Sequence, residues 1–129
     1  MIILSDEIYS ELSFNDNYKS ISNFCPEKTI ISTGLSKWCG AGGWRLGYFI
    51  IPENLKFLKD TLNVLASETF SAVSAPIQYA AIQAFKGDHT NYIKISRKIL
   101  QSVGSYTYDN LSSNKVLINK PQGGFYLMP

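Results

Sequence analysis

The stretch that decides both the fold and the candidate site is Ser32-Thr33-Gly34-Leu35-Ser36-Lys37-Trp38-Cys39-Gly40-Ala41-Gly42-Gly43-Trp44-Arg45-Leu46-Gly47. It holds one lysine, Lys37, and one arginine, Arg45, among glycines and serines. Glycine weakens helix and strand interiors by ~0.5–1 kcal/mol each, so the stretch is predicted to be a loop. Such a loop brings backbone amides, an amine and a guanidinium close to a ligand. An aldehyde that carries a phosphate suits that set of groups.

Short apolar runs on both sides of this loop predict strands. The runs cover residues 2–4, 29–31 and 47–51. They do not alternate with polar residues, which is typical of strands covered on both faces. The first run leads to Asp6, the second leads into the loop, and the third follows Arg45. Polar side chains at strand ends are the usual place for ligand chemistry in α/β sheets.

The rest of the chain predicts helices and then further strands. A helix opens at Pro52 with leucines at 55, 58, 62 and 65 on one face, and a second runs from Pro76 to a stop at Gly87. A third helix is predicted from about 90 to about 109. Runs at 116–118 and 124–128 predict two more strands. The predicted fold class is therefore α/β, and the chain is predicted to begin inside one strand and end inside another.

Composition excludes several classes of function. The chain has 129 residues, enough for one core, and its formal net charge of +2 is too small to indicate nucleic-acid binding. No apolar run approaches the ~18 residues of a membrane span. Cys25 and Cys39 have no partners at metal-binding spacing, so we expect reduced thiols in a cytoplasmic protein and no metal site.

Five residues offer groups that suit a pyridoxal phosphate ring. The amine of Lys37 can form a Schiff base with the aldehyde. The carboxylate of Asp6 can keep the ring nitrogen protonated, because an anion raises the pKa of a nearby base. The phenol of Tyr9 can donate to the ring oxygen. The guanidinium of Arg45 can hold the phosphate with two parallel hydrogen bonds, and the hydroxyl of Ser36 can fill a remaining phosphate acceptor.

At these residues the chain resembles the class I/II aminotransferases, which are pyridoxal-phosphate enzymes of fold type I. The cofactor-attachment motif of that family is similar to Gly34-Leu35-Ser36-Lys37 followed, after two residues, by Gly40-Ala41-Gly42-Gly43-Trp44-Arg45-Leu46-Gly47. Asp6-Glu7-Ile8-Tyr9 resembles the family's Asp-x-x-Tyr, and the segments 76–81 and 123–126 resemble later landmarks. One departure is Gly34, where the family often has a serine.

The resemblance implies a role for each of the five residues. Lys37 is implied as the Schiff-base lysine and proton shuttle, and Asp6 as the partner of the pyridinium nitrogen. Tyr9 is implied as a donor to the ring oxygen, and Ser36 and Arg45 as phosphate ligands. The resemblance also implies amino acid and 2-oxo acid substrates. The segment 70–74 lacks the arginine of dicarboxylate-specific members, which disfavours aspartate.

The resemblance further implies where the chain belongs in a longer protein. Residues 1–88 are expected to form the later part of a cofactor-binding large domain, a three-layer αβα unit with a mixed, mostly parallel sheet. Residues 89–129 are expected to form a connecting helix and the start of a small C-terminal α/β domain. The complete protein is expected to be a homodimer, and this chain alone is expected to be inactive.

Two alternatives stay open at this point. The same attachment site serves carbon–sulfur lyases, synthases and decarboxylases of fold type I, which differ in substrate rather than in cofactor. A non-catalytic remnant or regulatory domain is the alternative outside enzymes.

Overall fold

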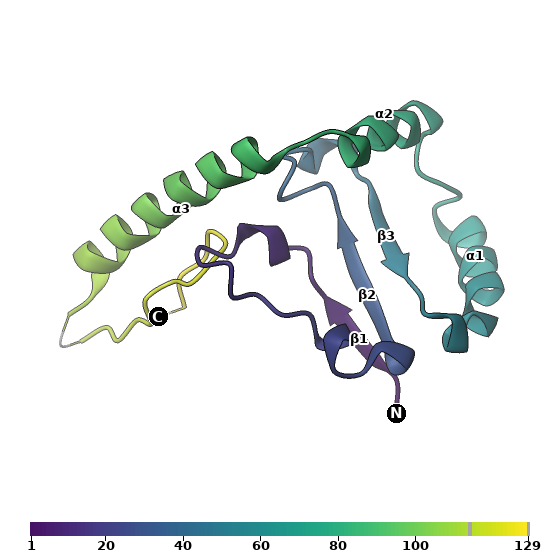
Figure 1. Ribbon diagram of the computed structural model, residues 1–129, viewed down its shortest axis with the longest axis horizontal. Helices are drawn as coiled ribbons and strands as arrows, with labels where there is room; N and C mark the ends of the chain where they lie inside the picture. Colours follow the sequence, from purple (N-terminus) through teal and green to yellow (C-terminus); the bar gives the residue numbers. More distant parts are fainter. Residues whose placement is uncertain (114, 129) are drawn as a thin grey trace. The chain divides into compact units, whose positions relative to one another are not determined.

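The computed structural model describes residues 1–113 and 115–128, which form three strands and three α-helices together with short 3-10 turns. The strands are β1 (Ile3–Asp6), β2 (Thr29–Gly34) and β3 (Gly47–Ile50), and the helices are α1 (Phe57–Thr69), α2 (Ala75–Lys86) and α3 (Thr90–Leu111) (Figure 1). The chain divides into two compact units. Unit 1 comprises Met1–Ile8 and Lys19–Gly87, and unit 2 comprises Tyr9–Tyr18 and Asp88–Pro129.

Unit 1 contains a mixed sheet in the order β1-β2-β3. β1 pairs with β2 in parallel, with Asp6 opposite Ser32, and β2 pairs with β3 antiparallel, with Gly34 opposite Gly47. Figure 1 shows the arrows of β1 and β2 pointing the same way and that of β3 pointing back. The predicted α/β class and the three strands around the loop are confirmed.

The prediction that these strands are covered on both faces is wrong for β1 and β3, whereas every residue of β2 is buried or half-buried. β1 alternates between half-buried and exposed positions, and all four residues of β3 are exposed. In unit 1 the sheet has only α1 and α2 to cover it, and α1 lies far enough from β2 and β3 to leave a cleft of about 740 Å³. A run without alternation shows that a strand could be buried on both faces, but burial needs neighbours as well.

The helices of unit 1 begin and end near the predicted signals. A 3-10 turn at Glu53–Leu55 follows Pro52, and regular α-helix starts at Phe57. α2 has Pro76 in its first turn and ends at Lys86, with Gly87 as its C-cap. The proline fits there because the first turn of a helix has no partner for its N–H groups.

Unit 2 consists of α3, a 3-10 turn at Ser10–Leu12 and the segment after α3. Arg97 on α3 donates from Nε to the carbonyl of Glu11 at 2.6 Å and also pairs with the carboxylate of Asp16, so it ties the 9–18 segment to the helix. The apolar residues Ile95 and Ile99 lie on the exposed side of α3. No helix in the described part of the chain has both the length and the apolar composition to cross a membrane.

The predicted strands at 116–118 and 124–128 are wrong: residues 115–128 form only isolated bridges, Ser113 with Val116 and Ser13 with Gly123. Backbone bonds from Phe14 N–H to Gln122 O (2.9 Å) and from Gly124 N–H to Leu12 O (3.0 Å) flank the second bridge. A β-propensity run becomes a strand only where a neighbour offers a continuous row of partners, and here the pairing stops after one bridge.

Candidate functional site

The topology of unit 1 gathers four predicted site residues at one edge of the sheet. Asp6 is the last residue of β1, and Ser36 and Lys37 follow the end of β2. Because β3 runs antiparallel to β2, the start of β3 lies at this same edge, and Arg45 comes two residues before it. The carboxyl ends of β1 and β2 therefore meet the amino end of β3, which is where α/β sheets place ligand chemistry.

The loop between β2 and β3 is closed by its own backbone. Leu35 N–H donates to Leu46 O at 3.2 Å, and Ala41 N–H donates to Leu35 O at 3.3 Å. Gly40 N–H donates to Lys37 O at 3.2 Å, so Lys37 heads a tight turn that ends at a glycine with φ of +65°. A residue with a Cβ is strained at that angle, so the glycine allows the turn that presents Lys37.

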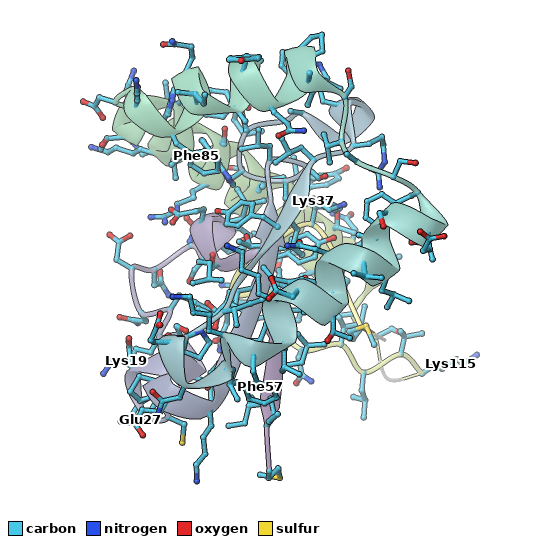
Figure 2. The ribbon with its side chains drawn as sticks, turned by 90° about the vertical axis from the view of Figure 1, so that its right-hand side faces the viewer. Lys19, Glu27, Lys37, Phe57, Phe85 and Lys115 are labelled. Atoms are coloured by element: carbon cyan, nitrogen blue, oxygen red, sulfur yellow. The ribbon has the colours of Figure 1, made fainter. Side chains whose placement is uncertain are left out.

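An apolar cluster anchors the same loop to α2. Leu35 is 1% exposed and Leu46 is 9% exposed, and both pack with Ala81 of α2. Trp38, next to the lysine, packs against this cluster, and its ring lies 6.2 Å from that of Phe85 on α2. The two ends of the loop are thus buried against a helix, and Lys37, which lies between them in the sequence, is half-buried. Figure 2 labels the side chains of Lys37 and of Phe85 on α2.

Gly34, the position where the related motif often has a serine, is explained by close packing. A Cβ on Gly34 would lie 2.5 Å from Leu46 O and 2.9 Å from Gly47 Cα, both backbone atoms. Contacts that short do not occur for real Cβ atoms, so β2 and β3 approach this closely only because glycine stands there. A serine would force the two strands apart.

Arg45 has an unusual backbone for a residue with a side chain. Its φ is +56° and ψ +48°, the left-handed region, directly after the 3-10 turn Gly42–Trp44. Its guanidinium Nη1 donates to Gly42 O at 2.7 Å, which folds the side chain back over the loop. Non-glycine residues in this region cost of order 1–3 kcal/mol and persist at functional sites where the surroundings hold them.

Asp6 is exposed at the end of β1, and its Oδ1 accepts from Ile8 N–H at 3.3 Å. Its neighbour Glu7 points the other way: Glu7 is 7% exposed, and its N–H donates to Ser32 O at 2.8 Å. Glu7 was not singled out by the sequence, where it reads as the second of two acidic residues. Its one signal is position: Glu7 directly follows Asp6 at the end of β1, and neighbouring side chains along a strand point to opposite faces.

Tyr9 belongs to unit 2, so four of the five predicted site residues lie together in unit 1. The Tyr9 ring makes edge contacts with Phe125 and Tyr126, at centroid distances of 5.4 and 5.9 Å. Its hydroxyl lies 3.5 Å from that of Tyr126. The sequence placed Phe125 and Tyr126 in a predicted strand and did not connect them with Tyr9.

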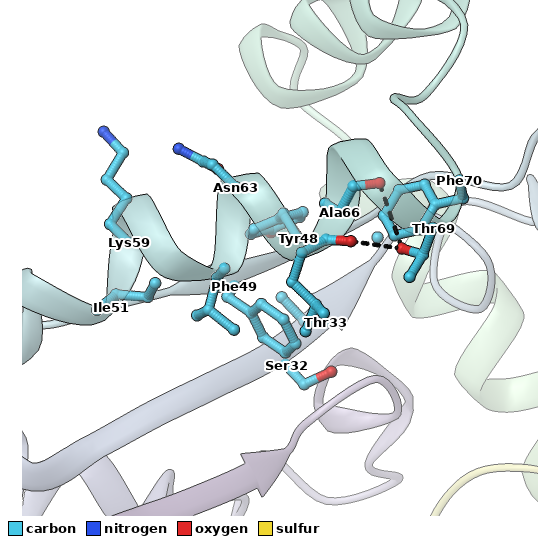
Figure 3. Close-up of a pocket in the computed structure, with 13 residues that line it drawn as sticks. Ser32, Thr33, Tyr48, Phe49, Ile51, Lys59, Asn63, Ala66, Thr69 and Phe70 are labelled. Carbon is cyan, nitrogen blue, oxygen red and sulfur yellow. Dashed lines mark hydrogen bonds between the residues drawn. The ribbon is translucent and has the colours of Figure 1, made fainter.

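The cleft between the sheet and α1 does not coincide with the predicted site (Figure 3). The polar side chains in its lining are those of Ser32, Thr33, Tyr48, Lys59, Asn63 and Thr69. The Thr69 hydroxyl donates to Leu65 O at 2.8 Å. Across the described ranges 1–113 and 115–128, no group of three His, Cys, Asp or Glu side chains has metal-binding geometry.

Comparison with known proteins gives a consistent result. The profile described as "Aminotransferase class I and II" matches residues 1–129. A probable N-acetyl-LL-diaminopimelate aminotransferase of Bacillus subtilis (strain 168) is 34% identical over 129 residues, covering 100% of this chain and 32% of that protein. An aspartate aminotransferase of Geobacillus stearothermophilus is 35% identical over 135 residues, covering 100% of this chain and 33% of that protein.

Solved structures similar to this chain are also those of aminotransferases. An alanine aminotransferase from Pyrococcus furiosus superposes with a TM-score of 0.82 at 34% identity, over 98% of this chain and 33% of that one. A Thermus thermophilus aspartate aminotransferase superposes with a TM-score of 0.87 over 98% of this chain and 33% of that chain, at 22% identity, which supports the fold alone. The chain spans about a third of the length of the relatives it matches.

Proposed function

This chain belongs to the aminotransferase class I and II family, whose members depend on pyridoxal phosphate, and from that premise we propose that it is part of an aminotransferase. The complete protein would move an amino group between an amino acid and a 2-oxo acid. The observation that carries this proposal is the meeting of Asp6, Ser36, Lys37 and Arg45 at one edge of the sheet.

The donor set at this edge fits the cofactor. The groups available are one amine, one guanidinium, one hydroxyl and one carboxylate, and they come from the ends of three neighbouring strands. A guanidinium and a hydroxyl suit a phosphate, and a carboxylate suits a protonated ring nitrogen.

Each residue has a defined task in this proposal. The cofactor, when bound, supplies an electron sink that stabilises negative charge at the substrate α-carbon. Lys37 Nζ would hold the cofactor covalently, and the incoming amine of the substrate would free it. Lys37 Nζ, once free, would act as general base and proton shuttle, taking the proton from the substrate α-carbon and delivering it to the C4′ carbon of the cofactor. Arg45 and Ser36 hold the phosphate, and Asp6 keeps the ring nitrogen protonated.

Tyr9 is proposed to complete the set by donating from its phenol to the ring oxygen. Residues 1–88 are proposed to belong to a three-layer αβα cofactor-binding domain, and residues 89–129 to a connecting helix and the start of a small domain. A homodimer and a cytoplasmic location are part of the same proposal. The two cysteines support the location only in being free thiols, Cys25 exposed and Cys39 half-buried.

We propose only the class of the substrates, an amino acid and a 2-oxo acid. The similar proteins carry names with different amino acids, among them aspartate and N-acetyl-LL-diaminopimelate, so similarity does not single out one of them. The missing arginine in segment 70–74 supports a substrate other than aspartate. Turnover that needs no 2-oxo acid acceptor would instead favour a lyase or decarboxylase.

The test is to trap the covalent link in the full-length protein that contains this chain. Borohydride reduction of the protein loaded with pyridoxal phosphate is expected to fix the cofactor on Lys37, as read by peptide mass spectrometry. Lys37→Ala is expected to lose the label, and Lys59→Ala, which changes a lysine of the separate cleft, is expected to keep it. Label on another lysine would reject the proposal. The 129-residue chain alone is expected to show no transaminase turnover.

A further inference from the structure

Glu7 is a buried acidic residue to which the proposed function gives no task. It is 7% exposed, and its Oε1 accepts hydrogen bonds from two hydroxyls, Ser20 Oγ at 2.6 Å and Ser5 Oγ at 3.1 Å. Charged residues are almost never buried without partners, so these two hydroxyls account for its position. Ser20 is itself held, since its Oγ accepts from Ser22 N–H at 3.1 Å at the start of a 3-10 turn.

Glu7 lies directly after Asp6 at the point where β1 leaves the sheet. Its backbone N–H donates to Ser32 O at 2.8 Å, and Ser32 is the residue paired with Asp6 in the strand register. The backbone bond and the side-chain bonds of Glu7 together hold this strand end on both sides, to β2 and to the segment that begins at Ser20.

The alternation of the strand turns this anchoring into an orientation. Ser5 is half-buried, Asp6 is exposed and Glu7 is buried. Successive side chains of a strand point to opposite faces, and a slip of one residue exchanges the faces. With Glu7 and Ser5 hydrogen-bonded to each other on one face, Asp6 is directed to the opposite face.

We propose that Glu7 is a positioning residue. Its buried carboxylate, hydrogen-bonded by Ser5 and Ser20, fixes the face of β1 to which the Asp6 side chain points. This inference rests on the proposed function, in which Asp6 serves the ring nitrogen of the cofactor. Asp6 can then reach the ring nitrogen of the cofactor only while Glu7 is held on the opposite face of β1.

Two variants test the anchor. Glu7→Leu replaces the carboxylate acceptor by an apolar side chain of similar size. Glu7→Gln keeps an acceptor oxygen at the same position. Glu27→Leu is the matched control, because Glu27 is exposed in unit 1. Ser20→Ala removes one hydroxyl donor and serves as the milder variant if Glu7→Leu does not fold.

The first measurement needs no cofactor. Amide hydrogen exchange of the full-length apoprotein is expected to speed up about tenfold at residues 6–8 in Glu7→Leu, less in Ser20→Ala, and to stay near wild type in Glu7→Gln and Glu27→Leu. Faster exchange spread equally over β2 and β3 would show a global stability effect and overturn the proposal. Unchanged exchange at residues 6–8 would also overturn it.

The second measurement is the absorption spectrum of bound pyridoxal phosphate, which depends on the protonation state of the bound cofactor and on the charges beside its ring. Glu7→Leu is expected to change the absorption band of the cofactor at neutral pH. The separate variant Glu7→Gln is expected to keep the wild-type band. A wild-type spectrum in Glu7→Leu, with the cofactor fully bound, would overturn the role through Asp6. If the wild-type protein itself binds no cofactor at Lys37, the proposed function fails, and the exchange measurement still decides whether Glu7 anchors the strand end.

Discussion

Replacing Gly34 by alanine tests how closely β2 and β3 approach beside the candidate site. The new Cβ would lie 2.5 Å from Leu46 O, about 0.9 Å short of the 3.4 Å at which ordinary contact begins, and 2.9 Å from Gly47 Cα. Both are backbone atoms, so no side-chain rotation relieves the overlap. The start of β3 must move, and with it the carbonyl that accepts from Leu35 N–H.

The expected cost is the sum of two losses less one gain. Overpacking a closely packed site costs about 1–3 kcal/mol. Losing the hydrogen bond between Leu35 N–H and Leu46 O leaves a buried polar group unsatisfied, which costs about 1–3 kcal/mol. Alanine also lowers the entropy of the unfolded chain, which returns about 0.4–1 kcal/mol. The free energy of unfolding is therefore expected to fall by about 1–5.6 kcal/mol.

Urea denaturation followed by tryptophan fluorescence measures this change, since Trp38 and Trp44 both lie in the loop. Two other glycines give a graded series. At Gly47 a Cβ would lie 3.3 Å from Thr33 O, so a small loss is expected, and at Gly43 nothing lies within 4 Å, so the change should stay within about 0.5 kcal/mol or be stabilising. Equal stability of the Gly34→Ala and Gly43→Ala variants would refute the reasoning.

Three further predictions concern the loop and the start of α3. Arg45→Lys should weaken pyridoxal phosphate binding about tenfold in a fluorescence titration, because lysine cannot bind phosphate with two parallel bonds; unchanged affinity would contradict the assigned role. Leu35→Ala should cost about 2–5 kcal/mol in urea denaturation, because Leu35 is 1% exposed, and a loss below about 1 kcal/mol would argue against an anchored loop. The hydrogen bond from Thr90 N–H lowers the pKa of Asp88 from its ordinary 3.8, so the stability that Asp88 contributes is present above that value and is lost as pH falls through its lowered folded pKa. Asp88→Asn should therefore make the acid limb of melting temperature against pH shallower, and identical limbs would rule this out.

Local signals in the sequence predicted the elements that depend on short-range physics. Pro76 and Gly87 predicted the two ends of α2 to within a residue. A proline fits the first turn of a helix and a glycine ends the helix, and neither effect depends on what the helix packs against. The loop between β2 and β3 was recognised for the same reason. Its glycines disfavour α-helix and strand, and the regular structure that forms between β2 and β3 is a short 3-10 turn, Gly42–Trp44.

Predictions that required a partner failed or were incomplete. The apolar runs at 116–118 and 124–128 have strand propensity, yet only isolated bridges form among residues 115–128, because the neighbouring 9–18 segment pairs at one position alone. The apolar face of β3 is exposed for a related reason, since α1 lies across a cleft from it. Propensity describes the strand, whereas pairing and burial describe its neighbours.

The sequence by itself determined the family and the candidate residues Asp6, Lys37 and Arg45, because their chemistry and spacing are properties of the chain. Tertiary structure decided three things that spacing cannot show. It brought these residues to one sheet edge through the antiparallel return of β3, it required glycine at 34 through a backbone contact, and it buried Glu7 while exposing Asp6. Each of these three outcomes depends on which residues of neighbouring strands lie opposite one another, and this register is set only when the strands pair.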